Sequence, residues 1–205
     1  MTARGRIDKR QAILAAAGEV FAREGYALAG VDVIAAEAGV AKPTVYNHFG
    51  DKETLFRETI AADADRALAE HLAAVDELRD GNDLRETLED VGHHMLVCHC
   101  AERSIALRRL LAAELTRFPD LIDIVRGRAA DRDTEALGDR LARLALAGRL
   151  RTLDPAQAAE QFIALLTGPV EARSRLGTRT VPDDELWAVT RAAVETFLRA
   201  FGEAG

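Results

Sequence analysis

Residues 31–56 read VDVIAAEAGVAKPTVYNHFGDKETLF and contain the parts of a helix-turn-helix. Helical patterns predict one short helix from Val31 to Ala38 and a second from Pro43 to Phe49, with Gly39 supplying the left-handed turn between them. Pro43 suits the first turn of a helix, where its missing N–H costs nothing. Small and apolar residues complete the motif at the helix crossing: Ile34, Ala35, Ala36, Val40 and Val45. We therefore predict a DNA-binding head, in preference to an ordinary amphipathic helix in a bundle.

The second helix of this motif leaves polar side chains near its exposed side. Hydroxyl and amide groups fix the register on DNA or meet base edges, whereas cations neutralise phosphates without specifying a sequence. Lys52 and N-terminal arginines are the predicted phosphate contacts, and Tyr46 and His48 have an alternative role as packing residues. The predicted DNA-contacting set is Lys42, Pro43, Thr44, Tyr46, Asn47, His48, Lys52 and Arg6.

The charge of the chain limits how it can contact nucleic acid. Its 205 residues carry a formal net charge of -7, with 48% hydrophobic and 30% charged residues. Proteins that coat nucleic acid nonspecifically are usually strongly basic, so any DNA contact must be local. No apolar run approaches a membrane span, which predicts a cytoplasmic protein without membrane contact. Cys98 and Cys100 lie two residues apart and suit no disulfide framework.

Helical periodicity continues along the chain, and no strand pattern interrupts it. An N-terminal helix is predicted from Lys9 to Glu24, ended by Gly25, and a long amphipathic helix from Asp51 to about Asp80. Caps and helix breakers divide the remainder into helices over residues 83–100, 101–118, 120–147, 156–175 and 183–201. The predicted fold is all-α, with a three-helix helix-turn-helix head at residues 1–55 and a larger helical effector-binding and dimerisation domain at residues 56–205.

The head also resembles a known family. Residues 39–49, followed by Asp51-Lys52 and Leu55-Phe56, look like the signature of TetR-family transcriptional repressors, and residues 13–26 are similar to the opening helix of that family. Residues 107–119 and 159–162 resemble its AefR-like C-terminal subgroup. Gly30 and Ala41 depart from the hydroxyl residues common at those positions, so two side chains that cap a helix or bind phosphate are missing.

This resemblance implies a ligand-responsive transcriptional repressor rather than an enzyme. It implies a homodimer that binds a palindromic double-stranded DNA operator and releases it when a small-molecule effector of unknown identity binds. In the family, the positions that commonly touch DNA match Lys42, Thr44, Tyr46, Asn47, His48 and Lys52. No cofactor and no metal are expected.

Two further residue sets are predicted in the body of the protein. The effector pocket is expected among the helices that carry His93, His94, Val97, Cys100, Leu111, Glu114, Leu115 and Phe162. Apolar periodicity alone does not distinguish a pocket from a subunit interface, but the resemblance favours the last two helices as a dimer interface. The predicted interface residues are Phe162, Leu166, Leu186, Thr190, Ala193, Phe197 and Phe201.

An unusual group of histidines and cysteines between residues 93 and 100 leaves an alternative open. His94 and Cys98 lie one helical turn apart on one face, but four ligands do not converge from this segment alone. The alternative is a metal- or redox-sensing repressor that uses His94 and Cys98. A small helical enzyme or ligand carrier is another, although no Ser-His-Asp order, phosphate loop or nucleotide fingerprint occurs.

Overall fold

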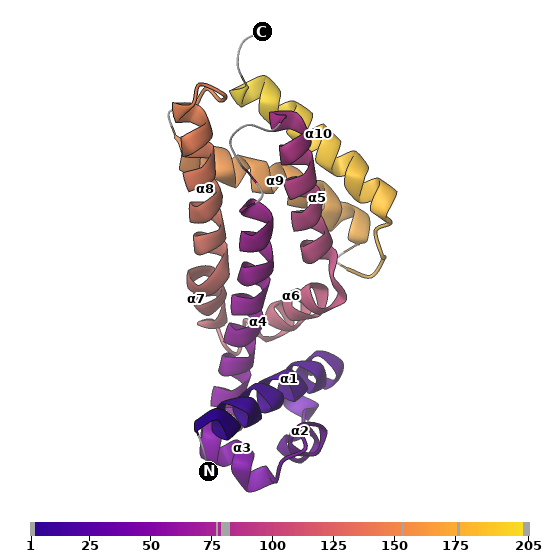
Figure 1. Cartoon of the computed structure of the whole chain (residues 1–205). Coiled ribbons are helices and arrows are strands. Elements are labelled where there is room, and N and C mark those ends of the chain that lie inside the picture. Colours follow the sequence, from indigo (N-terminus) through magenta and orange to yellow (C-terminus); the bar gives the residue numbers. More distant parts are fainter. Residues whose placement is uncertain (1–2, 77, 79–82, 153, 176, 203–205) are drawn as a thin grey trace. The chain divides into compact units, whose positions relative to one another are not determined.

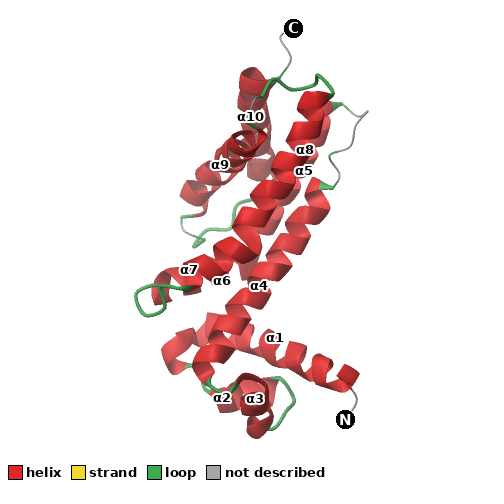
Figure 2. Cartoon of the chain, turned by 90° about the vertical axis from the view of Figure 1, so that its left-hand side faces the viewer, coloured by secondary structure: helices red, strands yellow, loops and turns green. Residues whose placement is uncertain are grey.

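The computed structural model of the chain describes residues 3–76, 78, 83–152, 154–175 and 177–202 and is built from helices (Figure 1). Figure 2 shows these described elements as helices joined by loops, which confirms the all-α prediction. The helices are α1 (Ala3–Leu28), α2 (Val31–Glu37), α3 (Lys42–Phe49), α4 (Lys52–Val75), α5 (Leu84–Cys100), α6 (Glu102–Glu114), α7 (Leu121–Val125), a π-helical turn (Arg126–Ala130), α8 (Asp131–Leu146), α9 (Pro155–Ser174) and α10 (Asp183–Phe201).

The described residues form two compact units whose boundary differs from the predicted one after residue 55. The first unit runs to Arg66 and also takes Ala106–Arg128, while the second holds Ala67–Ile105 and the chain from Ala129 onward. The chain therefore leaves the first unit within α4 and returns to it with most of α6 and with α7. Apolar residues of this returning segment, Leu110, Leu111, Phe118 and Leu121, are buried in one cluster with the head helices.

An aromatic group forms the centre of the first unit. The ring of Phe56 on α4 lies 4.9 Å from those of Phe21 and Tyr26 on α1. Phe118, which follows α6, places its ring 4.8 Å from Tyr26 and 5.4 Å from Phe56. Gly25 interrupts α1 with a non-helical backbone (φ 74°, ψ 166°), so the predicted stop is a kink after which one further turn continues to Leu28.

The second unit packs α5, α8, α9 and α10 with the last turns of α4 around their own core, in which Phe162 and Phe197 form an edge-to-face pair. Asp83 and Asp154 cap α5 and α9, because each carboxylate accepts the main-chain N–H three residues later, at 3.1 and 2.9 Å. Gly92 permits the close approach of α5 to α9 and α10, since a Cβ there would meet Leu166 and Thr190 at 3.2 Å.

One predicted helix, at residues 120–147, is not continuous. The structure divides it into α7, the π-helical turn and α8, and Gly127 lies in that turn. Glycine favours such an interruption because it stabilises helical geometry poorly. The helix predicted for residues 101–118 also ends early, at Glu114, because the chain must turn before Phe118 can enter the core of the first unit.

Candidate nucleic-acid interface

The turn between α2 and α3 has the backbone geometry that the sequence predicts. Gly39 has a φ of 64°, and no heavy atom outside the glycine and its chain neighbours lies within 4 Å of the position a Cβ would take, so conformation rather than space favours glycine there. The N–H groups of Gly39 and Val40 donate to carbonyls of α2 at 3.1 and 3.0 Å. These bonds satisfy the end of α2 and set the direction in which α3 begins.

Helix α3 has one buried side and one exposed side. Val45 and Phe49 are buried in the core of the first unit, together with Ile34 and Ala35 of α2, and Val40 packs partly against the same cluster. On the other side Lys42, Pro43, Tyr46 and Asn47 are exposed, while Thr44 and His48 are half-buried. Tyr46 is 42% exposed to solvent, which argues against its alternative role as a core residue. The helix therefore presents a polar face next to two apolar anchors.

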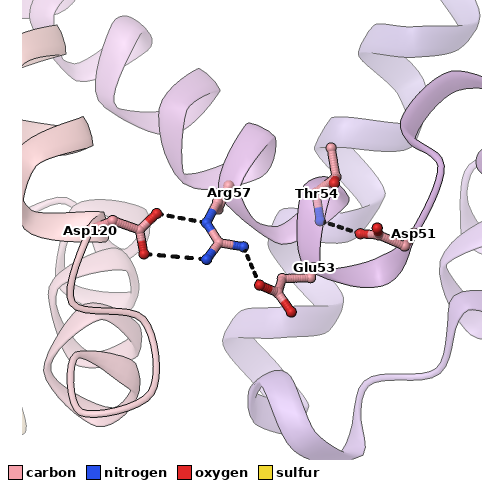
Figure 3. Close-up of polar contacts among 5 residues, drawn as sticks. All are labelled: Asp51, Glu53, Thr54, Arg57 and Asp120. Atoms are coloured by element: carbon pink, nitrogen blue, oxygen red, sulfur yellow. Dashed lines mark hydrogen bonds and ion pairs between the residues drawn. The ribbon is translucent and has the colours of Figure 1, made fainter.

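The helix caps follow the residues that the sequence supplies. Neither Gly30 at the start of α2 nor Ala41 at the start of α3 makes a side-chain cap, so both helices begin on main-chain bonds alone. Asp51, by contrast, accepts the Thr54 N–H at 2.6 Å at the start of α4 (Figure 3). This hydrogen bond stabilises the carboxylate and lowers the pKa of Asp51.

The ammonium of Lys52 contacts an aromatic ring and a main-chain carbonyl of the first unit. Nζ lies 4.7 Å from the centre of the Tyr26 ring and donates to the Ala27 carbonyl at 3.3 Å. Burial, and then the charge of Arg117, lower the pKa of this lysine. Arg117 itself lies 4.7 Å from the centre of the same Tyr26 ring. A phosphate contact from Lys52 would therefore start from an ordered side chain.

Two further cations of the head, Lys42 and Arg10, have acidic neighbours. Lys42 lies 3.8 Å from Asp32 of α2, and Arg10 forms a 2.7 Å ion pair with Glu58 of α4 while its guanidinium covers the Phe49 ring. The side chain of Arg6 lies outside the described residues. The predicted reading surface is thus a set of polar groups on α3 rather than a broad basic patch, as the net charge of the chain requires.

Arg57 joins α4 to the segment between α6 and α7, a contact that the sequence did not indicate. Its Nε and Nη2 donate to the two carboxylate oxygens of Asp120 at 2.7 and 3.3 Å, and its Nη1 donates to Glu53 at 2.7 Å (Figure 3). These bonds raise the pKa of Arg57 and lower that of Asp120. The Glu53–Arg57 spacing of four residues could have been found from the sequence. Asp120 could not, because 63 residues separate it from Arg57.

The eight residues predicted for an effector pocket are divided between the two units. Leu111, Glu114 and Leu115 belong to the first unit and the other five to the second. Within the second unit, His93 stacks on Trp187 at 3.9 Å and contacts Asp183 at 2.8 Å through Nε2, while Phe162 is completely buried in the core. The set as a whole stays a prediction.

A hollow that the sequence did not indicate lies in the first unit and has a volume of about 450 Å³. It is lined by Thr54, Arg57, Glu58, Ala61, Asp123, Ile124, Gly127 and Arg128.

The predicted dimer interface needs correction. Six of its seven residues are buried inside their own chain, because the apolar stripes of α9 and α10 face the core of the second unit, and Phe201 is half-buried against that core. A side chain already covered by its own subunit is not available to a partner. The residues concerned are Phe162, Leu166, Leu186, Thr190, Ala193, Phe197 and Phe201.

Nothing in the geometry of the His93 to Cys100 segment favours the metal- or redox-sensing alternative. Across the part of the chain that the structure describes, no three His, Cys, Asp or Glu side chains are grouped to hold a metal ion. His94 is exposed and Cys98 is half-buried, and neither Cys98 nor Cys100 is in a disulfide. Burial raises the pKa of the Cys98 thiol, which disfavours the reactive thiolate.

Comparison with known proteins covers both parts of the chain. Residues 13–59 match the description "Bacterial regulatory proteins, tetR family", and residues 86–203 match "AefR-like transcriptional repressor, C-terminal domain". The transcriptional repressor AcnR of Corynebacterium efficiens is 30% identical over 85% of this chain and 86% of its own length. The transcriptional activator FasR of Mycolicibacterium smegmatis is 41% identical over 31% of this chain, a match that spans only 29% of FasR.

A solved structure agrees over nearly the full length. A TetR-family transcriptional regulator from Mesorhizobium loti is 27% identical, with a TM-score of 0.91 and coverage of 99% of this chain and 100% of that one. Among the described residues, every helix is too short or too polar to cross a membrane.

Proposed function

The chain belongs to the TetR family of bacterial regulatory proteins and is a DNA-binding transcriptional regulator rather than an enzyme; from this premise we propose that it is an effector-released repressor that acts as a homodimer in the cytoplasm. The observation that carries the proposal is the exposed polar face of α3, on a helix that buries Val45 and Phe49 and starts after the Gly39 turn. Two such helices would enter successive major grooves about 34–36 Å apart on a palindromic operator.

The candidate contacts have separable roles. Lys42, Thr44, Tyr46, Asn47 and His48 would meet base edges or fix the register, because they lie on or beside the exposed face of α3. Lys52 would bind a phosphate by turning its ammonium away from the Tyr26 ring, whose centre lies 4.7 Å from Nζ. Pro43 and the N-terminal Arg6 complete the proposed set.

Selection of bound sequences from random genomic fragments tests the DNA-binding part. Enrichment of one palindrome is expected, and Asn47→Ala should change which bases are preferred. Lys52→Ala should instead weaken binding to all sequences and reduce the slope of log affinity against log salt by about one. Arg132→Ala on α8 removes an exposed cation of the second unit and serves as the control, with no expected change of slope. Recovery of no common sequence would refute the operator proposal.

We propose that the outward faces of α9 and α10 form the dimer interface, rather than the apolar residues of these helices that are buried in the core of the second unit. Small exposed residues lie at helical spacing on both: Ala164, Gly168 and Ala172 on α9, and Ala188, Ala192, Thr196 and Ala200 on α10. Such faces allow two copies to pack closely. Ala192→Glu should convert the dimer to a monomer by light scattering and abolish operator binding. Ala147→Glu, at an exposed alanine after α8, should leave both unchanged, and an Ala192→Glu dimer would disprove this interface.

Effector release requires only that the effector bind more tightly to the head spacing that does not fit DNA. A compound that releases the operator from the wild-type protein should itself bind less tightly when operator is present. The factor by which operator weakens compound binding should equal the factor by which the compound weakens operator binding. Equal effector affinity with and without operator would contradict release by this mechanism.

A further inference from the structure

The second unit buries few polar side chains, and all but one are satisfied within the described chain. Thr87, Ser174 and Thr190 each donate their hydroxyl to a main-chain carbonyl three or four residues earlier, at 2.7 to 3.1 Å. The exception is Asp133 in the first turn of α8, which is only 7% exposed. Among the described residues of this unit, it is also the one buried acidic or basic side chain.

The two carboxylate oxygens of Asp133 have different surroundings. Oδ2 lies 2.9 Å from Nδ1 of His71 on α4, a contact that joins residues 62 positions apart. Oδ1 is shielded from solvent, and among the described residues no group donates a hydrogen bond to it. A buried carboxylate oxygen without a donor is unfavourable, so native proteins rarely keep one unless water, an ion or a ligand completes it.

The groups around Asp133 indicate which kind of donor could bind its Oδ1. Burial is the main cause of the raised pKa of Cys98 on α5, and the charges of Glu70 and Asp133 add to it, so both carboxylates act on the same region. His71 on α4 contacts Asp133 directly, and Cys98 on α5 lies near enough for the charge of Asp133 to act on its thiol. They are not arranged as a metal site within the described part of the chain. Apolar neighbours on the same helices, Leu137 and Ala74, are completely buried.

We propose that Oδ1 of Asp133 is the recognition point for a protonated amine, and that the effector of this regulator carries one. His71 would act as a positioning residue: with its proton on Nδ1 it donates to Oδ2, which fixes the carboxylate and leaves Oδ1 open to a second donor. A cation suits the position better than a neutral hydroxyl, because its hydrogen bond to the Asp133 carboxylate is charge-assisted. An anionic ligand would be repelled. That the bound amine acts as an effector rests on the proposed function, but amine binding itself can be measured without DNA.

Three probes of matched shape test the charge preference: benzylammonium, benzyl alcohol and benzoate, each titrated calorimetrically into the full-length protein without DNA. Benzylammonium should bind most tightly and benzoate least. Asp133→Asn keeps the size of the side chain and removes its charge, and it should weaken benzylammonium about tenfold or more, which corresponds to about 1.4 kcal/mol. Asp139→Asn makes the same change at an exposed position of α8 and should not alter binding.

A second measurement needs no change at Asp133 and so does not depend on that variant folding. In a Cys100→Ser background Cys98 is the remaining thiol, and benzylammonium should slow its alkylation by iodoacetamide while benzoate should not. Equal protection by benzoate, equal benzylammonium affinity of Asp133→Asn and wild type, or no binding of any probe would each overturn the proposal; in the last case water satisfies Oδ1.

The operator separates this inference from the proposed function. If benzylammonium binds at Asp133 but leaves the operator bound, the amine site stands and its regulatory role fails. If no operator exists, the proposed function fails while the titrations still decide the site.

Discussion

Phe118 lies far from the helix-turn-helix in sequence, yet we expect its removal to destabilise that motif. The side chain is 2% exposed, and its ring contacts those of Tyr26 and Phe56. Truncation of a buried phenylalanine costs about 3–5 kcal/mol, and the loss of two aromatic pairs places Phe118→Ala near the middle of that range, at about 4 kcal/mol. This loss should fall mainly on the first unit, because Phe118 packs within its cluster.

Native-state hydrogen exchange with mass-spectrometric readout measures where the loss falls. A loss of about 4 kcal/mol should accelerate exchange of the most protected amides of α1 to α3 by about 1,000-fold. Phe197→Ala is the matched control, because Phe197 is equally buried, lies between Phe162 and Phe201 at 5.0 and 4.9 Å, and belongs to the second unit. Phe197→Ala should instead accelerate amide exchange in α5, α9 and α10. Unchanged exchange in α1 to α3 of Phe118→Ala, or the same pattern in both variants, would refute the assignment of Phe118 to the core of the first unit.

Three further predictions concern single positions. Gly39→Ala should lower the stability of the first unit by about 1–2 kcal/mol, because an L-residue must adopt a left-handed φ there, and an unchanged melting temperature would contradict this. The lowered pKa of Asp51 means that its bond from the Thr54 N–H adds stability above the ordinary pKa of an aspartate, and this is lost as pH falls through the pKa in the folded protein. Asp51→Ala should therefore flatten the acid limb of melting temperature against pH, whereas a parallel curve would argue against the cap. The pKa of Cys98 is raised, so in the Cys100→Ser variant the Cys98 thiol should be alkylated more slowly at pH 8 than a model thiol. An equal alkylation rate would show that burial does not suppress the thiolate.

The head illustrates how far local sequence can predict structure. The predicted spans of α2 and α3 agree with the observed ones to within a residue or two, because glycine and proline set the backbone at Gly39 and Pro43 through their own geometry. The anchors Val45 and Phe49 were equally predictable, since residues four apart on a helix share a face. The positions of Lys42 and Asn47 on the outer side of α3 follow from the same periodicity.

Other features depended on which faces meet. Helical periodicity identified the apolar stripes of α9 and α10 but not their partners, so Phe162 and Phe197 were predicted to contact a second copy and are instead buried in their own subunit. The position of a stripe is a local property, whereas its partner depends on the packing of the whole unit.

The sequence by itself determined that the chain is helical, that it carries a helix-turn-helix of the TetR type, and which side chains α3 exposes. The helices and the exposed side of α3 follow from interactions between residues a few positions apart, and the TetR type follows from the resemblance of the motif to that family. Only the tertiary structure decided that the segment after α6 completes the core of the head, that Arg57 holds Asp120, and that His71 meets Asp133. Each of these pairs unites residues more than sixty positions apart, and such contacts form only once the burial of apolar surface has chosen which helices lie together.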